Sequence, residues 1–172
     1  DEFLALSYWR EKKVPVIIVR LFNTVGPRQV GEYGMVIPRF VGQALSGKPI
    51  TIYGSGRQTR CFAYVSDVVA AMIKLTTARQ AAGNIFNIGS DEEISINELA
   101  KKVRDKTGTG AKIIRIPYEK AYGKGFEDME RRVPDISRIR KAIGYRPTLN
   151  IDQILDRVVE DMKGETVDRD EH

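Results

Sequence analysis

The apolar positions of the chain change between helical and strand spacing, starting with residues 2–13. That stretch is predicted to be an amphipathic helix that ends before Pro15, because a residue that precedes proline is pushed out of the helical region. Residues 16–22 are almost continuously β-branched and apolar, which is typical of a parallel strand buried on both faces. Residues 23–34 have no period and contain three glycines and a proline, so they are predicted to be a loop at the carboxyl end of that strand. Open α/β sheets bind ligands at this end.

The same two spacings predict the remaining elements. Ser95 and Glu98 have the pattern of a reciprocal capping box, and Ser66 and Asp135 are predicted to cap the helices that they precede. Residues 118–133 have no clear period and are predicted to form a long functional loop or a flexible excursion. Helices are expected over residues 36–45, 66–75, 95–106, 135–143 and 150–162, short strands over 49–53, 59–65, 84–88 and 112–116, and a frayed acidic tail over 164–172.

Helices and short strands that alternate in this way indicate an α/β fold. Three phenylalanines, Phe40, Phe62 and Phe86, are spaced as core residues. Cys61 is predicted to be a small buried filler, since no histidine lies near it in sequence to activate its thiol. The inner face of the helix after Ser66 is expected to consist of Val68, Ala71, Met72 and Leu75.

Composition narrows the class of protein. The 172 residues are 42% hydrophobic and 30% charged, as in an ordinary globular protein, and no apolar run approaches the roughly 18 residues that a membrane span needs. A single cysteine cannot form an internal disulfide, and with His172 as the one histidine the ligands of a zinc or iron–sulfur site are missing. The protein is therefore expected to be reduced, metal-independent and cytoplasmic.

The positive charge is concentrated in one part of the chain. The net charge is +5, and residues 1–60 carry nine basic and four acidic side chains, whereas residues 61–172 carry nineteen of each. The arginines of residues 1–60 stand singly among Gly, Pro, Asn and Thr. Such spacing suits a compact anionic ligand better than a nucleic-acid backbone, which needs a broad basic face. Nucleic acid is therefore not expected as a partner.

Three arginine-bearing segments are candidate anion sites. Residues 23–29, Asn-Thr-Val-Gly-Pro-Arg-Gln, suit a phosphate or a sugar, although a polar loop that satisfies its own backbone would have the same composition. Residues 54–60, Gly-Ser-Gly-Arg-Gln-Thr-Arg, resemble a phosphate cradle but lack the Lys-Ser/Thr pair of a Walker loop and the third glycine of a dinucleotide fingerprint. A hairpin turn with solvated arginines is the simpler interpretation of that segment. Residues 131–135, Arg-Arg-Val-Pro-Asp, could be a surface charge pair ahead of a capped helix.

Four segments taken together resemble a known family. Residues 20–28, 37–40, 52–68 and 132–135 are similar in sequence and order to the carboxyl-terminal half of extended short-chain dehydrogenases/reductases. Within this family the chain looks most like NAD-dependent nucleotide-sugar epimerases and dehydratases, close to UDP-glucose 4-epimerase and UDP-glucuronate decarboxylase-like members. Residues 125–129 depart from the decarboxylase pattern, so the branch stays open.

The resemblance implies a division of the chain and a set of site residues. Residues 1–34 would end a Rossmann-type dinucleotide-binding domain with its last parallel strands, residues 35–163 would form a small α/β subdomain that binds the sugar nucleotide, and residues 164–172 would be the tail. Asn23 would contact the substrate diphosphate, Arg60 and Arg132 would grip it as one clamp, and the backbone of Leu21, Phe22 and Asn23 would pass the nicotinamide of NAD. The residues that would enclose the nucleobase are Val36, Ile37, Phe40, Thr51, Ile52 and Tyr53.

The family's glycine-rich fingerprint and its catalytic Tyr-x-x-x-Lys pair would lie upstream of this chain. Tyr8 and Lys12 have the spacing of that pair, but they stand at the end of the helix before Pro15, too late to correspond to it. The resemblance therefore implies no catalytic residue and no metal ligand in this chain. The full-length protein would use NAD to oxidise a sugar hydroxyl transiently, and this half alone would be inactive. Its partners would be a nucleoside-diphosphate sugar and a second copy in a homodimer, and it would not bind a membrane.

An alternative from a different class is a stand-alone, non-catalytic module that binds a nucleotide or another anion. The native reading frame would separate the two hypotheses. About 150 further residues upstream, with the fingerprint and the catalytic pair, would identify the enzyme. A start codon near Asp1 would favour the module.

Overall fold

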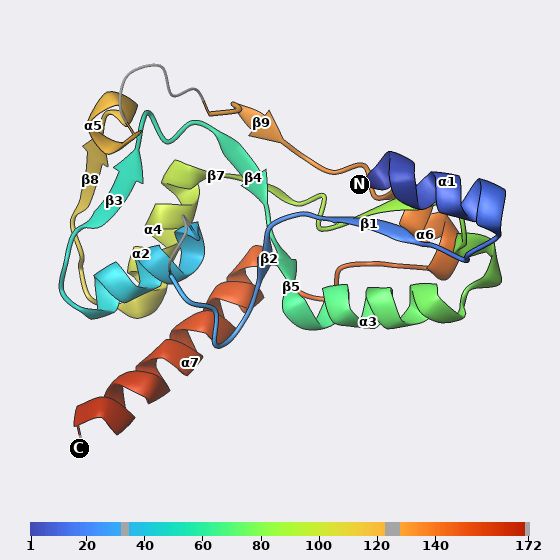
Figure 1. Cartoon of the computed structure of the whole chain (residues 1–172). Coiled ribbons are helices and arrows are strands. Elements are labelled where there is room, and N and C mark those ends of the chain that lie inside the picture. The colour runs from blue at the N-terminus through green and yellow to red at the C-terminus, as the bar shows by residue number, and fades with distance from the viewer. Residues whose placement is uncertain (32–34, 123–127, 171–172) are drawn as a thin grey trace. The chain divides into compact units, whose positions relative to one another are not determined.

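The computed structural model of the chain describes residues 1–31, 35–122 and 128–170 (Figure 1). They divide into two compact units, each assembled from three separate segments. Unit 1 comprises residues 1–24, 61–92 and 133–148, and unit 2 comprises residues 25–60, 93–132 and 149–172. The predicted boundaries at residues 34 and 163 divide the chain according to the ligand that each part is expected to bind. The two units are defined by packing instead, so those boundaries stay a prediction.

Unit 1 is built on a pair of parallel strands. β1 pairs with β6 in a register that runs from Ile18↔Ile85 to Leu21↔Ile88. In Figure 1, β1 lies between helices α1 and α3. The elements of unit 1 are α1 (Glu2–Lys12), β1 (Ile18–Leu21), β5 (Ala63–Tyr64), α3 (Val65–Thr77), the 3-10 helix η1 (Arg79–Ala81), β6 (Ile85–Ile88) and α6 (Ser137–Ile143), with β2 (Thr24–Val25) at its boundary.

The parallel pairing of β1 confirms the expected strand, but its predicted burial on both faces is wrong. Leu21 is 49% exposed, and Arg20 is exposed and pairs with Glu2 of α1. No residue of α1 is buried. A nearly continuous apolar strand gains full burial only where layers cover both of its faces, and unit 1 by itself does not supply them.

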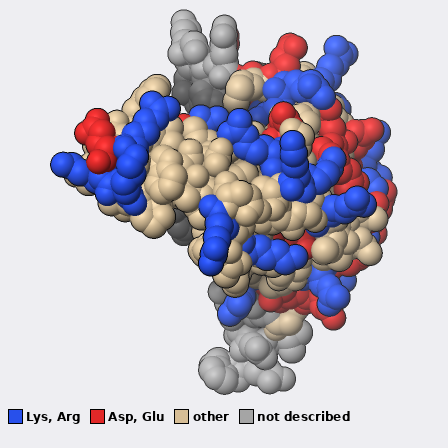
Figure 2. Space-filling model, turned by 90° about the vertical axis from the view of Figure 1, so that its right-hand side faces the viewer, with Lys and Arg blue, Asp and Glu red and all other residues tan. Residues whose placement is uncertain are grey.

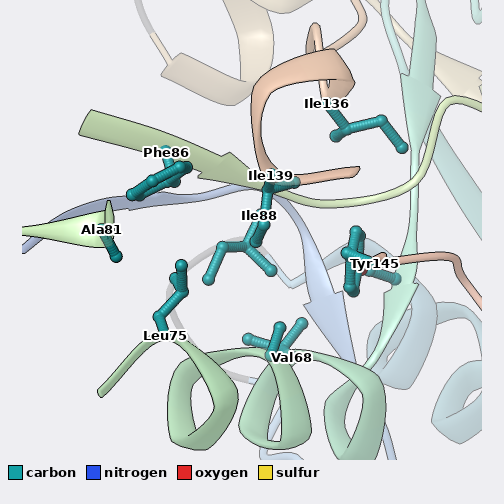
Figure 3. Close-up of a cluster of buried hydrophobic side chains, with 10 residues drawn as sticks. Val68, Leu75, Ala81, Phe86, Ile88, Ile136, Ile139 and Tyr145 are labelled. Carbon is teal, nitrogen blue, oxygen red and sulfur yellow. The ribbon is translucent and has the colours of Figure 1, made fainter. Parts of the chain in front are cut away.

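The core of unit 1 gathers around β6 (Figure 3). There, Val68 and Leu75 of α3 point toward Phe86 and Ile88 of the strand. Burial, with smaller contributions from two nearby carboxylates, raises the pKa of Tyr145 to about 12, so its hydroxyl stays protonated and donates to the carbonyl of Gly89 at 2.9 Å. The ten residues of the cluster are Ala63, Val68, Ala71, Leu75, Ala81, Phe86, Ile88, Ile136, Ile139 and Tyr145.

The start of α3 corrects three predictions. The expected strand 59–65 is two short strands, and α3 begins at Val65 with Tyr64 as its N-cap, so Ser66 lies inside the first turn and caps nothing. Met72, expected on the inner face, is 40% exposed because the inward stripe follows Val68, Ala71 and Leu75, and Met72 lies at the edge of that stripe.

Unit 2 combines three packed helices with two small sheets. Helices α2, α4 and α7 contact one another, and α2 and α4 also contact β3, which pairs in parallel with β8 from Ile50↔Ile113 to Tyr53↔Ile116. A three-stranded sheet has the order β7-β4-β9. The elements are α2 (Val36–Leu45), β3 (Ile50–Tyr53), β4 (Thr59–Cys61), β7 (Glu93–Ser95), α4 (Ile96–Thr107), β8 (Ile113–Ile116), α5 (Tyr118–Tyr122), β9 (Arg131–Arg132) and α7 (Ile151–Asp170).

Most predicted core residues of unit 2 are buried where the periodicity puts them. Residues 36–45 form the expected helix, and Phe40 is fully buried; Phe62 and Cys61, assigned to unit 1, are buried as well.

Two segments contain more regular structure than was predicted. The segment 118–133 contains α5 and β9, while its residues 123–127 lie outside the described residues. The last helix continues to Asp170 through the expected frayed tail, because Gly164 lowers helix propensity without ending a helix.

The helix termini show which cap predictions were right. Ser95 accepts the N–H of Glu98 while the Glu98 carboxylate accepts the N–H of Ser95, so the predicted capping box is confirmed. Asp135 does not occupy the N-cap of α6, which is Ile136, although its carboxylate accepts the N–H of Ser137 at 2.8 Å.

None of the helices in the described ranges is long and apolar enough to cross a membrane. Within the same ranges, no group of three or more His, Cys, Asp or Glu side chains could hold a metal ion.

We expect Ser95→Ala to lower the free energy of unfolding by about 1 kcal/mol, the usual cost of losing an N-cap side chain. Ser66→Ala is the matched control and should change it little, because Ser66 caps no helix. Urea unfolding followed by circular dichroism measures both. Equal losses in the two variants would contradict this assignment.

The stabilisation by the capping box should also depend on pH. Hydrogen bonds from the Ser95 side chain and backbone lower the pKa of Glu98 in the folded chain. A carboxyl whose pKa is lowered by folding stabilises the fold above its unfolded pKa, and that stabilisation is lost as the pH falls through the folded pKa. The difference between wild type and Ser95→Ala should therefore be larger at neutral pH than in acid.

Candidate functional site

The sheet β7-β4-β9 brings two of the predicted site arginines together. β4 and β9 are parallel, and their register pairs Thr59 with Arg131 and Arg60 with Arg132. Paired residues on neighbouring strands project from the same face of a sheet, and their strands lie about 4.8 Å apart. Arg60 and Arg132, which are far apart in the sequence, are therefore neighbours on one face.

On the opposite face of this sheet, Glu93 forms a salt bridge with Arg131 and a hydrogen bond with Thr59. The Thr59 hydroxyl donates to the carboxylate of Glu93 on β7, and Arg131 donates to the same carboxylate from Nε and Nη2 at 2.9–3.1 Å. The hydrogen bond from Thr59, followed by those from Arg131, lowers the pKa of Glu93. Because successive side chains of a strand alternate, the Arg131-Arg132 pair of the sequence is divided between the two faces. Arg131 links β9 to Glu93 of β7, and Arg132 is exposed on the other face of the sheet.

Arg60 is the more enclosed of the two candidate arginines. Its side chain is 12% exposed. Nη1 donates to the carbonyls of Thr59 at 2.7 Å and Met129 at 2.8 Å, and Nη2 donates to Oδ1 of Asp128 at 2.5 Å. The guanidinium thus joins β4 to the segment that leads into β9.

Asp128 is also held by Tyr118, which is itself hydrogen-bonded to Gln58. The hydroxyl of Tyr118 donates to Oδ2 of Asp128 at 3.1 Å and accepts a hydrogen bond from Nε2 of Gln58 at 2.7 Å. The sequence patterns missed Tyr118 and Asp128, because the segment 118–133 has no period and the partner of Asp128 lies 68 residues away. No local signal indicates such a contact.

The Gly-Ser-Gly turn after β3 packs against neighbouring side chains. Gly54 has φ +71°, and a Cβ there would come within 2.2 Å of the Tyr118 ring. At Gly56, with φ +69°, a Cβ would meet the amide of Asn97, whose Nδ2 also donates to the carbonyl of Ser55 at 3.0 Å. These contacts favour the interpretation as a tight turn over that as a phosphate cradle.

The six residues expected around a nucleobase lie on α2 and β3 and fall into two groups. Ile37, Phe40 and Ile52 are fully buried and form the framework of unit 2. Val36, Thr51 and Tyr53 are partly exposed. The residues that could face a ligand here are therefore these three.

Arg39 is a neighbour of this group that the sequence patterns did not single out. Its guanidinium lies over the ring of Tyr53, 4.3 Å from the centroid, and donates to the carbonyl of Thr51 at 3.3 Å. A cation over a tyrosine ring holds that ring in one orientation. The segment Ile37-Pro38-Arg39-Phe40 carried part of the family resemblance, and it could have drawn attention to Arg39.

Asn23 belongs to unit 1 and is hydrogen-bonded to the last residue of β4 and the first residue of β5. Its Nδ2 donates to the carbonyl of Cys61 at 2.8 Å, and its own carbonyl accepts the N–H of Ala63 at 3.0 Å. Thr24 donates to the carbonyl of Phe22, as a loop that satisfies its own backbone would. The expected contact between Asn23 and a diphosphate stays a prediction, because the two arginines belong to the other unit.

The residues expected near NAD make backbone hydrogen bonds within unit 1. The N–H of Phe22 donates to the carbonyl of Ile88 at 2.9 Å, and the carbonyl of Asn23 is used by Ala63. Leu21 offers an apolar, half-exposed side chain. The expected contact between these three residues and the nicotinamide stays a prediction.

Solved structures of nucleotide-sugar enzymes have this fold. The chain matches the UDP-glucuronic acid 4-epimerase of Bacillus cereus, solved with UDP-glucuronic acid and NAD, with a TM-score of 0.84 and 27% identity over 95% of this chain and 50% of that one. It matches the UDP-glucose 4-epimerase of Thermotoga maritima, solved with UDP-glucose, with a TM-score of 0.85 and 27% identity over 96% of this chain and 51% of that one. The predicted α/β fold with Rossmann-type parallel strands is thus confirmed.

Curated relatives are similar over almost the whole chain. The UDP-N-acetyl-alpha-D-glucosaminuronate decarboxylase of Bacillus cytotoxicus is 41% identical over 93% of this chain and 50% of its own length. UDP-glucuronic acid decarboxylase 4 of Arabidopsis thaliana is 36% identical over 94% of this chain and 35% of its own length. The chain therefore spans half or less of the length of these relatives.

The family itself is defined by a match over residues 2–89, just over half of the chain, to the model described as the NAD dependent epimerase/dehydratase family. The match includes β1, the turn after β3 and the start of α3, which are the segments that carried the resemblance in the sequence. Structural neighbours of the chain have been solved as complexes with NAD, so NAD is the cofactor of this family. The chain belongs to the NAD-dependent epimerase/dehydratase family of nucleotide-sugar enzymes.

Proposed function

We propose that this chain is the sugar-nucleotide-binding half of an NAD-dependent nucleotide-sugar epimerase, dehydratase or decarboxylase. The observation that carries the proposal is the register of β4 and β9, which pairs Arg60 with Arg132 on one face of a sheet. In the proposed role, these two side chains bind the diphosphate of the substrate.

Two arginines on one sheet face suit a diphosphate for physical reasons. A diphosphate carries at least two negative charges, and the planar guanidinium can donate two parallel hydrogen bonds to one phosphate. The backbone pairing of β4 and β9 fixes the separation of the two Cα atoms. Glu93 holds Arg131 on the other face, so that arginine does not compete for the ligand.

In this proposal the nucleobase binds near α2 and β3, against Val36, Thr51 and Tyr53. The fully buried Ile37, Phe40 and Ile52 support that surface from behind. Arg39 would hold the Tyr53 ring ready for stacking. Because these contacts are remote from the reacting sugar, their binding energy can serve to align the sugar for reaction.

The substrate class in the proposal is a UDP-linked sugar, with a uronic acid favoured. This choice is supported by relatives named as decarboxylases of UDP-linked uronic acids and by a structural neighbour solved with UDP-glucuronic acid. In the complete protein NAD would accept and return a hydride, and residues outside this chain would hold it. This chain would bind and orient the sugar nucleotide and would be inactive alone.

The proposal includes a homodimer in the cytoplasm. Exposed apolar side chains on two helices of unit 1 support self-association: Phe3, Leu4 and Tyr8 of α1, and Val69, Met72 and Ile73 of α3. Figure 2, which views the side of the molecule that carries α1, α3 and α6, shows uncharged surface between Lys and Arg side chains. A single, buried cysteine is consistent with a reducing compartment.

Replacing either arginine should weaken binding of UDP-glucuronic acid. In the full-length enzyme, we expect Arg60→Ala and Arg132→Ala each to weaken the free energy of binding by about 1.5–3 kcal/mol, the scale of a lost hydrogen bond to a charged group, as measured by calorimetric titration. The double variant should lose less than the sum, because both side chains would grip the same diphosphate. Arg131→Ala is the matched control, since it removes a neighbouring arginine from the opposite face. The proposal fails if the two single variants bind as tightly as wild type.

NAD should not bind this chain with micromolar affinity. The family resemblance places the groups that hold the cofactor, the glycine-rich fingerprint and the catalytic Tyr and Lys, outside these residues. Titration of the 172-residue chain with NAD checks this expectation. A micromolar dissociation constant would contradict it.

The chain should self-associate as its concentration rises. Burying the apolar surfaces of α1 and α3 against a second copy would remove them from water. Sedimentation velocity over a concentration series should show a monomer giving way to a dimer. A monomer that persists at high concentration would count against the homodimer.

A further inference from the structure

Arg60 is fixed along one edge of its guanidinium. Arginine has five N–H donors, two on Nη1, two on Nη2 and one on Nε. In the described part of the chain, Nη1 donates to the carbonyls of Thr59 and Met129, and Nη2 donates one hydrogen bond to Asp128. One N–H on Nη2 and the N–H on Nε are not used by these three contacts. Two donors on adjacent nitrogens are what a bidentate contact with a phosphate requires.

The carboxylate that meets Arg60 is itself held from a second side. Oδ1 of Asp128 accepts from Arg60, while Oδ2 accepts from the hydroxyl of Tyr118. Tyr118 is fixed in turn, because Gln58 donates to its hydroxyl and its ring packs against the backbone at Gly54. The contacts form a chain, Gln58–Tyr118–Asp128–Arg60, that lies entirely within unit 2.

From these contacts we infer that Asp128 is a positioning residue for Arg60 and that Tyr118 supports it. The inference rests on the proposed function, in which Arg60 binds the substrate diphosphate. Asp128 does not touch the ligand; it holds the guanidinium so that the Nε edge is presented in one orientation. A guanidinium that is already ordered loses less conformational entropy when it binds a phosphate. Asp128 therefore strengthens binding of the diphosphate, although it carries the same sign of charge.

The test compares UDP with uridine as probes for the 172-residue chain. Both probes contain the base and the ribose, and UDP alone contains the diphosphate. The ratio of their dissociation constants, measured by NMR titration, reports the diphosphate contacts separately from the fold and from the nucleobase surface. A loss of structure would weaken both probes and would leave no selective change in the ratio.

Three variants separate positioning from other roles. Asp128→Ala removes the carboxylate and should reduce the preference for UDP over uridine about tenfold, equivalent to about 1.4 kcal/mol. Asp128→Asn keeps an oxygen acceptor for Arg60 and should restore most of that preference. Tyr118→Phe keeps the ring against Gly54 and removes the hydroxyl, so it should reduce the preference by a smaller factor. Glu130→Ala is the matched control, because it removes an acidic side chain from the same segment without touching Arg60.

A spectroscopic readout tests the positioning directly. The ¹⁵N–¹H signal of the Arg60 Nε group, assigned by its loss in Arg60→Lys, should show in its ¹⁵N relaxation the restricted motion of an ordered side chain in wild type. Its motion should increase in Asp128→Ala and stay close to wild type in Asp128→Asn. An unchanged Nε signal in Asp128→Ala would overturn the inference.

The remaining outcomes distinguish the two levels of the argument. If wild type binds UDP no better than uridine, the proposed function fails. If wild type prefers UDP and Asp128→Ala keeps that preference, the proposed function stands and the positioning role fails. Tighter binding of UDP by Asp128→Ala or Asp128→Asn would show that Asp128 competes with the diphosphate, and would also overturn the inference. Should Asp128→Ala not fold, Tyr118→Phe carries the comparison, because it removes one hydrogen bond to Asp128, and an unchanged preference for UDP in that variant would overturn the inference.

Discussion

Parallel pairing between strands that are distant in sequence is the constraint on which both units depend. β1 pairs with β6, β3 with β8, and β4 with β9, each in parallel. Parallel neighbours cannot be joined by a tight turn, so each pair needs a long crossover connection. Each unit is consequently built from three separate segments of the chain. The pair of arginines on β4 and β9 exists only because one such crossover closes in the correct register.

The sequence was informative wherever a single element carries its own pattern. The apolar residues of α2 recur with the helical period, and the capping box of α4 is complete within four residues. Both elements could therefore be predicted from the sequence. Ser66 was misjudged because the helix starts one residue earlier, with Tyr64 as its N-cap, and Met72 because it lies at the edge of the inward stripe. The exposure of Leu21 depends on what covers β1 rather than on the strand's own composition, which is why the apolar pattern alone indicated burial on both faces.

The candidate site divides along the same line. Arg60 and Arg132 came from motifs that the family shares, and their pairing in the sheet then follows from the register. Asp128 and Tyr118 have no motif, and they matter only through contacts made after the chain has folded. The face with Arg60 and the face with Glu93 also differ in a way no linear pattern shows. On one face, the carboxylate of Glu93 in β7 binds Arg131 of the same sheet. On the other face, the carboxylate of Asp128, which lies in the segment before β9, binds Arg60.

The division into interleaved segments also has a consequence for synthesis on the ribosome. Unit 1 needs residues 133–148 and unit 2 needs residues from 149 onward, so neither can close while most of the chain is emerging. Until then, β1 lacks its parallel partner β6 and β3 lacks its parallel partner β8 whenever the later strand has not yet been synthesised. Unpaired apolar strands are open to pairing with other chains, and folds dominated by distant contacts form slowly. A chain with this topology is therefore expected to expose unpaired strands for longer during synthesis than a chain of equal size built from local hairpins or helix pairs.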